Sequence, residues 1–126
     1  MSNLAASPQA YRRTAGMAAT RGELVVILYD GARRFLRQAA AAMAEGDIER
    51  SHHTLRHAEL IVAHLDGTLD HDQGEIADRL HAIYTYCLKR LLDSRLERDP
   101  GKVDEVHELL GELRDAWAQI AREDGA

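Results

Sequence analysis

The sequence predicts an all-α protein, an antiparallel up-down four-helix bundle with a short N-terminal helical arm. Leu, Ala, Ile and Val supply most of the apolar residues, and this mix favours helices. Only two prolines occur, Pro8 and Pro100, so the long stretch between them lacks the residue that most reliably breaks a helix. Along four segments the apolar residues recur every three or four positions, which is the period of an amphipathic helix.

The chain of 126 residues has the length of a single domain. Residues 1–19 are rich in Ala, Ser and Gln and show no sustained apolar period, so we expect a mobile arm with a short helical stretch at residues 9–14. The predicted bundle domain covers residues 20–122. We expect the last residues, from Arg122 to Ala126, to fray into solvent.

The first helix should begin at Thr20, because Thr20 and Glu23 have the spacing of a capping box, in which each side chain satisfies a backbone N–H. Gly46 suits the end of this helix, and Asp47 suits the cap of the next one. The predicted core stripe of the first helix is Leu24, Leu28, Gly31, Phe35, Ala39 and Ala42. That of the second helix, the most regular in the chain, is Ile48, Ser51, Leu55, Ala58, Val62, Leu65 and Leu69.

A polar stretch from His71 to Gly74 predicts a tight turn before a third helix, which should run to about Arg98. Asp99 and Pro100 then suit the start of a fourth helix, since proline is harmless in a first helical turn. The predicted stripe of the third helix is Ile76, Leu80, Ile83, Cys87 and Leu91. That of the fourth is Val103, Val106, Leu110, Leu113, Trp117 and Ile120. Short turns make neighbouring helices antiparallel.

Charge and composition exclude several kinds of partner. Acidic residues outnumber basic ones by 21 to 16, and no run of Lys and Arg is long enough to follow a phosphate backbone, so we expect no nucleic-acid binding. The single cysteine, Cys87, cannot form an internal disulfide. No segment is apolar over the length that a membrane crossing needs. We therefore expect a cytoplasmic protein that does not insert into membranes.

The histidines of the second helix are the main argument for a metal site. His53 and His57 have a one-turn spacing that can bind one ion, but with His64 they fall nearly opposite the core stripe, at about 100° per residue. Glu49 and His52 form one Glu-x-x-His pair, whereas a ferritin-like di-iron site needs two. We expect no metal, no cofactor and no enzymatic activity, and a metal-binding helical bundle enzyme is the less favoured alternative.

The first and third helices carry more apolar residues than a bundle core needs, because a bundle helix requires one apolar stripe and a polar opposite face. We expect the additional side chains to line a groove for an amphipathic helix of a partner, with the arm around Tyr11 as a lid. A wide core stripe covered by the arm, or a structural protein that self-associates through these stripes, would explain the same pattern. The predicted partner-binding residues are Tyr11, Val25, Tyr29, Leu36, Tyr84, Leu88 and Leu92.

Two fragments of the first predicted helix carry a resemblance to a known family. Thr20-Arg21-Gly22-Glu23-Leu24, leading into Leu28-Tyr29-Asp30-Gly31-Ala32, resembles the opening of the FliS family of flagellar export chaperones. Gly74-Glu75-Ile76-Ala77 and Leu113-Arg114-Asp115-Ala116-Trp117 are similar to later parts of the family pattern. The resemblance covers roughly Tyr11 to Ile120.

This resemblance implies a four-helix bundle that binds the disordered C-terminal segment of flagellin. Such a chaperone prevents premature polymerisation of its client and delivers it to the export gate of the flagellar type III export apparatus. The resemblance also implies that the flagellin segment becomes helical in apolar grooves, and that an arm tyrosine, matched here by Tyr11, occupies part of this surface. We expect a chaperone that acts by protein–protein interaction, as a monomer or weak homodimer.

Overall fold

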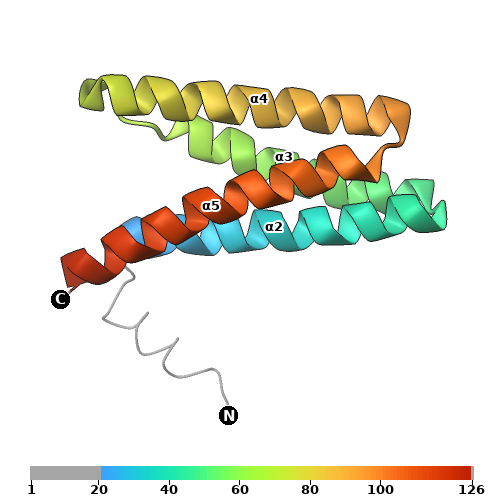
Figure 1. Ribbon diagram of the computed structural model, residues 1–126, viewed down its shortest axis with the longest axis horizontal. Helices are drawn as coiled ribbons and strands as arrows, with labels where there is room; N and C mark the ends of the chain where they lie inside the picture. Colours follow the sequence, from blue (N-terminus) through green and yellow to red (C-terminus); the bar gives the residue numbers. More distant parts are fainter. Residues whose placement is uncertain (1–20, 126) are drawn as a thin grey trace, which may run out of the picture.

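The computed structural model describes residues 21–125, and within them the chain folds into four long helices and one short 3₁₀ helix. The long helices are α2 (Arg21–Glu45), α3 (Ile48–Gly67), α4 (Glu75–Glu97) and α5 (Pro100–Gly125), and the short one is η1 (His71–Gln73). Each long helix contacts the next, and α5 returns to pack against α2 (Figure 1). The predicted all-α antiparallel bundle is confirmed, whereas the predicted N-terminal arm lies outside the described residues.

The ends of the helices follow local signals in the sequence. Gly46 ends α2 with φ at 76°, a left-handed conformation that glycine adopts without steric cost. Asp47 then caps α3, because its Oδ1 accepts a hydrogen bond from the backbone N–H of Arg50 at 3.1 Å. At the start of α5, Asp99 Oδ1 accepts from the N–H of Gly101 at 2.9 Å. The predicted boundaries at these turns are confirmed.

Two helix ends differ from the prediction or extend it. The predicted cap Thr20 lies just before the described residues, and α2 is helical from Arg21 onward. The expected fraying from Arg122 is wrong, because α5 continues to Gly125. Arg122 lies in the last turn, where a positive charge is favourable beside the unpaired carbonyl groups of the helix end.

The core runs along the centre of the bundle and receives side chains from all four long helices. On α3 the buried residues Leu55, Ala58, Val62 and Leu65 confirm the predicted stripe, although Ile48 at its start is exposed. On α5 the predicted residues Val103, Val106 and Leu110 are fully buried.

Helix α4 is held less closely than the other long helices. Helix α2 packs along both α3 and α5, whereas α4 approaches its two neighbours less closely. Ion pairs at the surface help to connect α4: Arg95 pairs with Glu59 of α3 at 2.9 Å, and Arg90 pairs with Glu105 of α5 at 2.7 Å. Beyond the Arg90–Glu105 pair, α5 runs away from α4 toward the end of the bundle where α2 begins (Figure 1).

Candidate functional site

The core face of α2 differs from the predicted one over part of the helix, whereas Gly31, Ala39 and Ala42 are buried as predicted. Tyr29 and Leu36, which the sequence analysis placed on a second, outward face, are fully buried. The predicted core residues Leu28 and Phe35 are half-buried, and Leu24 is exposed. Burial of Tyr29 is favourable because its hydroxyl has a hydrogen-bonding partner inside the bundle, so the core can accommodate a tyrosine.

That partner is Tyr84 of α4, which is also buried. The two hydroxyl oxygens lie 2.5 Å apart and form a hydrogen bond between helices that are not neighbours in the bundle. Burial raises the pKa of Tyr29 above its usual value, and the hydrogen bond with Tyr84 raises it further. Burial also raises the pKa of Tyr84. Both side chains are therefore neutral at physiological pH and form part of the packed core.

The remaining predicted partner-binding residues occupy different environments. Val25 and Leu88 are half-buried and pack against the core, whereas Leu92 is exposed on α4. Tyr11 lies outside the described residues. The expected outward placement of Tyr29, Leu36 and Tyr84 is wrong, since no partner can reach a fully buried side chain in this conformation. Their role in binding stays a prediction.

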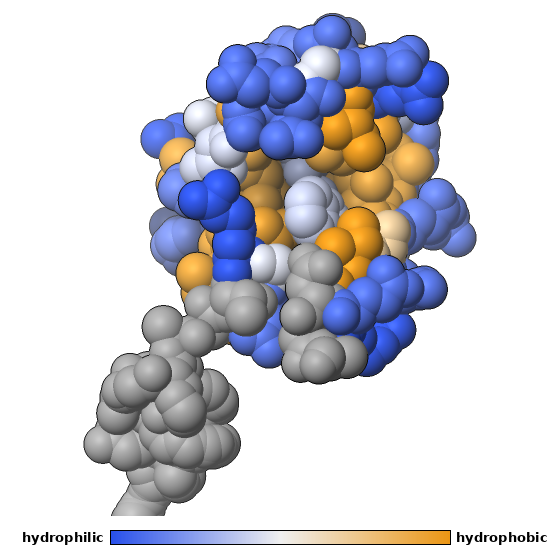
Figure 2. All heavy atoms as spheres, turned by 90° about the vertical axis from the view of Figure 1, so that its left-hand side faces the viewer, coloured by the Kyte–Doolittle hydropathy of each residue, from blue (hydrophilic) through white to orange (hydrophobic). Residues whose placement is uncertain are grey.

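Some of the apolar side chains that face outward lie at one end of the bundle, whereas Ile48, Leu92 and Leu96 are exposed toward the other end. Exposed fractions are 51% for Leu24 and 59% for Ile27 on α2, 61% for Ile76 on α4, and 45% for Ile120 on α5. Because α2 and α4 begin at the end where α5 finishes, these residues lie at the same end (Figure 1). Figure 2 looks onto this end and shows apolar surface in a hollow between polar surfaces. We call it the open end.

The walls of the open end come from the stretches of α4 and α5 that run apart. Leu80 and Ile83 on α4, and Leu113 and Trp117 on α5, are only half-buried and pack against the core from its edge. The sequence analysis placed all four in the core stripes, together with Leu24, Ile76 and Ile120, and missed Ile27. The signal was present, because the apolar stripes of α2 and α4 are too wide for one core. The prediction placed Tyr29, Leu36 and Tyr84 outward, but they are buried.

The histidines of α3 are exposed, with the exception of His57. His57 is half-buried and stacks on Phe35 of α2 with ring centroids 4.8 Å apart, so its expected solvated position is wrong. His53 lies edge-on to His57 at 4.6 Å. Within residues 21–125 no group of three or more His, Cys, Asp or Glu side chains is arranged to hold a metal ion. In the same part of the chain no helix is long and apolar enough to cross a bilayer.

Comparison with known proteins identifies the family. The family model described as "Flagellar protein FliS" matches residues 3–124. The flagellar secretion chaperone FliS of Bacillus subtilis is 36% identical over 110 residues, which are 87% of this chain and 82% of that protein. Flagellar secretion chaperone FliS of Salmonella typhimurium is 34% identical over 122 residues, 95% of this chain and 90% of that protein. That of Vibrio cholerae is 32% identical over 122 residues, 93% and 90%. The chain belongs to the FliS family of flagellar secretion chaperones, which are not enzymes.

Proposed function

We propose that this protein is a cytoplasmic export chaperone that holds the disordered C-terminal segment of flagellin. By covering that segment it prevents premature polymerisation, and it delivers flagellin to the flagellar type III export gate. The observation that supports this function is the open end, where large aliphatic side chains from three helices are exposed and apolar surface lies in a hollow (Figure 2). Contiguous apolar surface of this kind is typical of a binding site.

The open end can supply a useful part of the binding free energy. Full burial of a large aliphatic side chain contributes about 1.5–3 kcal/mol. Leu24, Ile27, Ile76 and Ile120 each have about half of their surface left to bury. Their burial under an apolar helix stripe would contribute about 1 kcal/mol each, or about a thousandfold in affinity for the four together.

The client site in this proposal differs from the one that the sequence predicted. Its contacts are the exposed residues of the open end, with the half-buried walls of α4 and α5 behind them. The predicted residues Tyr29, Leu36 and Tyr84 support this surface from below, because they fill the core on which its walls pack. Leu92 lies toward the other end of α4, so a substitution there distinguishes the two versions of the site.

The test is calorimetric titration of the intact chain with a peptide of the flagellin C-terminal segment, together with circular dichroism. We expect one-to-one binding with a dissociation constant in the micromolar range or below and a gain of helical signal on mixing. Replacing Ile76 and Ile120 together by Ser should weaken binding by about thirtyfold, since about 2 kcal/mol of apolar burial is lost. Leu96→Ser is the matched control, because Leu96 is 73% exposed near the opposite end of α4.

Two results would contradict the proposed site. If Leu92→Ser weakens binding as strongly as the double variant, the client lies along another face of α4. If the peptide produces neither heat nor helical signal, the chaperone does not hold this segment. Tyr11→Ala tests the predicted lid in the same assay, and a competing lid predicts tighter client binding in that variant.

Self-association is the second candidate use of the open end, because exposed aliphatic surface also suits a second copy of the chain. We propose a monomer or weak homodimer. Light scattering from low to high micromolar concentration should show no more than a weak rise in mass. A stable oligomer that Ile76→Ser disperses would favour the structural role.

A further inference from the structure

The outer side of the α2–α5 pair carries a polar cleft that the client site does not use. The cleft has a volume of about 650 Å³, and Gly111 of α5 forms part of its lining. A Cβ atom on Gly111 would lie 2.8 Å from Arg33 Nη2, so the absence of a side chain lets the Arg33 guanidinium lie flat across α5. No apolar residue of the open end lines this cleft.

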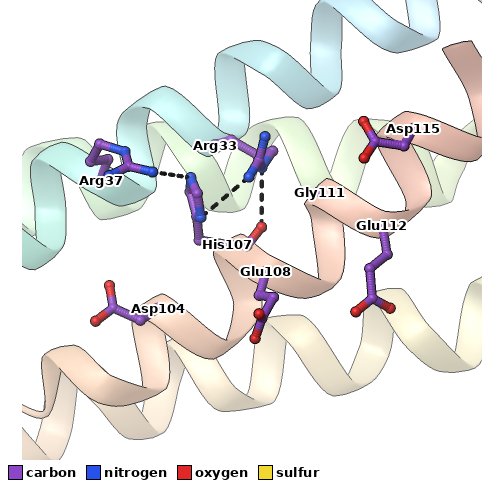
Figure 3. A pocket seen from close by; sticks show the side chains of 8 residues that line it. All are labelled: Arg33, Arg37, Asp104, His107, Glu108, Gly111, Glu112 and Asp115. Carbon is purple, nitrogen blue, oxygen red and sulfur yellow. Dashed lines mark hydrogen bonds between the residues drawn. The ribbon is translucent and has the colours of Figure 1, made fainter.

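Two arginines of α2 converge on one histidine of α5 in the cleft (Figure 3). Arg33 donates from Nε to the backbone carbonyl of His107 at 3.1 Å, and its Nη2 lies 3.5 Å from His107 Nδ1. Arg37 Nη2 lies 3.3 Å from His107 Nε2. A neutral imidazole has one N–H and one lone pair, so it accepts from only one of these two guanidinium groups. At the other contact, the N–H of the imidazole faces an N–H of the second guanidinium group, so two donors meet without an acceptor.

The positive charges of the cluster lack a carboxylate partner. Among the side chains that the structure describes, neither Arg33 nor Arg37 forms an ion pair. The next turn of the same face shows the ordinary arrangement, in which Arg114 of α5 pairs with Asp30 of α2 through Nε and Oδ1 at 2.9 Å. A cluster of guanidinium donors at a cleft, without such a partner, is a place where a planar carboxylate can accept two parallel hydrogen bonds.

Carboxylates do line the rim of the cleft, along the outward side of α5. Asp104, Glu108 and Glu112 follow one another four residues apart, and Figure 3 shows the side chains of Glu108 and Glu112 turned away from the arginines, with Asp104 to one side. The rim would repel a uniformly anionic polymer such as a nucleic acid. It would instead pair with lysines or arginines that flank an acidic residue. The charges of the cleft therefore fit a peptide segment that has an acidic residue at its centre and basic residues on either side.

We propose that Arg33, Arg37 and His107 form a docking site for an acidic side chain in a mixed-charge segment of a second protein. The carboxylate accepts from both guanidinium groups and from a ring N–H of His107. Basic residues beside it pair with the acidic rim of α5. Because this face and the open end are formed by different residues, the chaperone can hold a client and a second protein at the same time.

Protonation of His107 is coupled to this docking. Burial and the positive charges of Arg33 and Arg37 lower the pKa of His107, while Asp104 and Glu108 act in the opposite direction. A bound carboxylate adds negative charge beside the ring and so raises this pKa, which means that binding takes up a proton. The affinity should therefore rise severalfold as pH falls from about 8 to about 6, where a histidine titrates.

The test is an NMR titration of the intact ¹⁵N-labelled chain with a short blocked peptide that has a central pair of glutamates flanked by lysines. We expect shifts confined to the signals around Arg33, Arg37, His107 and Gly111. Replacing both arginines by Gln should weaken binding by about tenfold or more, since charged hydrogen bonds are lost. Arg34→Gln is the matched control, because Arg34 lies on α2 next to the cluster and is exposed outside it.

Further measurements make the test independent of how well a variant folds. With the wild-type chain, a peptide whose glutamates are replaced by glutamine should not bind. His107→Gln should keep binding but lose its dependence on pH. Equal binding of the glutamine peptide, or equal shifts in the double arginine variant, would overturn the proposal. So would inorganic phosphate that shifts the same signals while the peptide does not, because the cluster would then be a simple anion site.

Discussion

The buried pair of tyrosines makes a quantitative prediction about stability. Tyr29 and Tyr84 share a hydrogen bond across the bundle, and each hydroxyl is removed from water. Replacing one of them by Phe deletes a hydroxyl and leaves its partner without this bond, which costs about 1–3 kcal/mol in the free energy of unfolding. We expect similar costs for Tyr29→Phe and Tyr84→Phe, because each change leaves one buried hydroxyl without its partner.

The double variant distinguishes a hydrogen bond from simple packing. With both hydroxyls removed, the orphaned group disappears, so Tyr29→Phe with Tyr84→Phe should cost clearly less than the sum of the single changes. Urea unfolding followed by circular dichroism measures these free energies. We expect the urea midpoint to shift while the dependence of the unfolding free energy on urea concentration stays the same. Strictly additive losses would refute the reasoning, since two independent packing defects would then explain the data.

The same pair predicts a loss of stability in alkali. Burial raises the pKa of both tyrosines above the value of about 10 in the unfolded chain, so the unfolded state releases these protons first as pH rises. Their contribution is complete below about pH 10 and falls above it, by at most about 1.4 kcal/mol per pH unit for each tyrosine. Urea midpoints measured at increasing pH should fall less steeply in the double Phe variant. Equal slopes in the two proteins would contradict the assignment.

Three further changes test the core, a turn and the thiol. Leu36→Ala empties a fully buried site and should cost about 2–5 kcal/mol in urea unfolding. Arg98→Gly should raise the thermal midpoint and stabilise by about 0.5–1 kcal/mol, because Arg98 has φ of 55° where glycine has no Cβ strain. Burial raises the pKa of the Cys87 thiol to about 12, so Ellman's reagent should react with it at mildly alkaline pH only after unfolding.

The helix ends could be predicted from the sequence because their signals are local. Gly46 tolerates a positive φ, Asp47 accepts from an N–H three residues on, and Asp99 caps a helix that begins at a proline. Each of these interactions lies within one turn of chain. A reader of the sequence can find them without knowing what packs against the helix.

The rotation of α2 and α4 about their axes could not be predicted in the same way. Both carry two apolar stripes of similar regularity, and the choice between them depends on the neighbouring helices. The sequence analysis assigned Tyr29 to the second stripe and so turned it outward, but its hydroxyl is satisfied inside the bundle by Tyr84, which lies 55 positions along the chain. His57 was misplaced for a similar reason, because its partner Phe35 lies on another helix.

The looser attachment of α4 has a consequence for the local opening of the fold. Ion pairs at the surface contribute little and are screened by salt. Amide hydrogens of α4 should therefore exchange with deuterium earlier than those in the middle of α2, and added salt should widen the difference. The pairs that connect α4 to its neighbours are Glu59–Arg95, Asp66–His81, Arg90–Glu105 and Glu97–Lys102. The fold thus combines a central helix, α2, that is closely packed on two sides with one helix, α4, that detaches more readily.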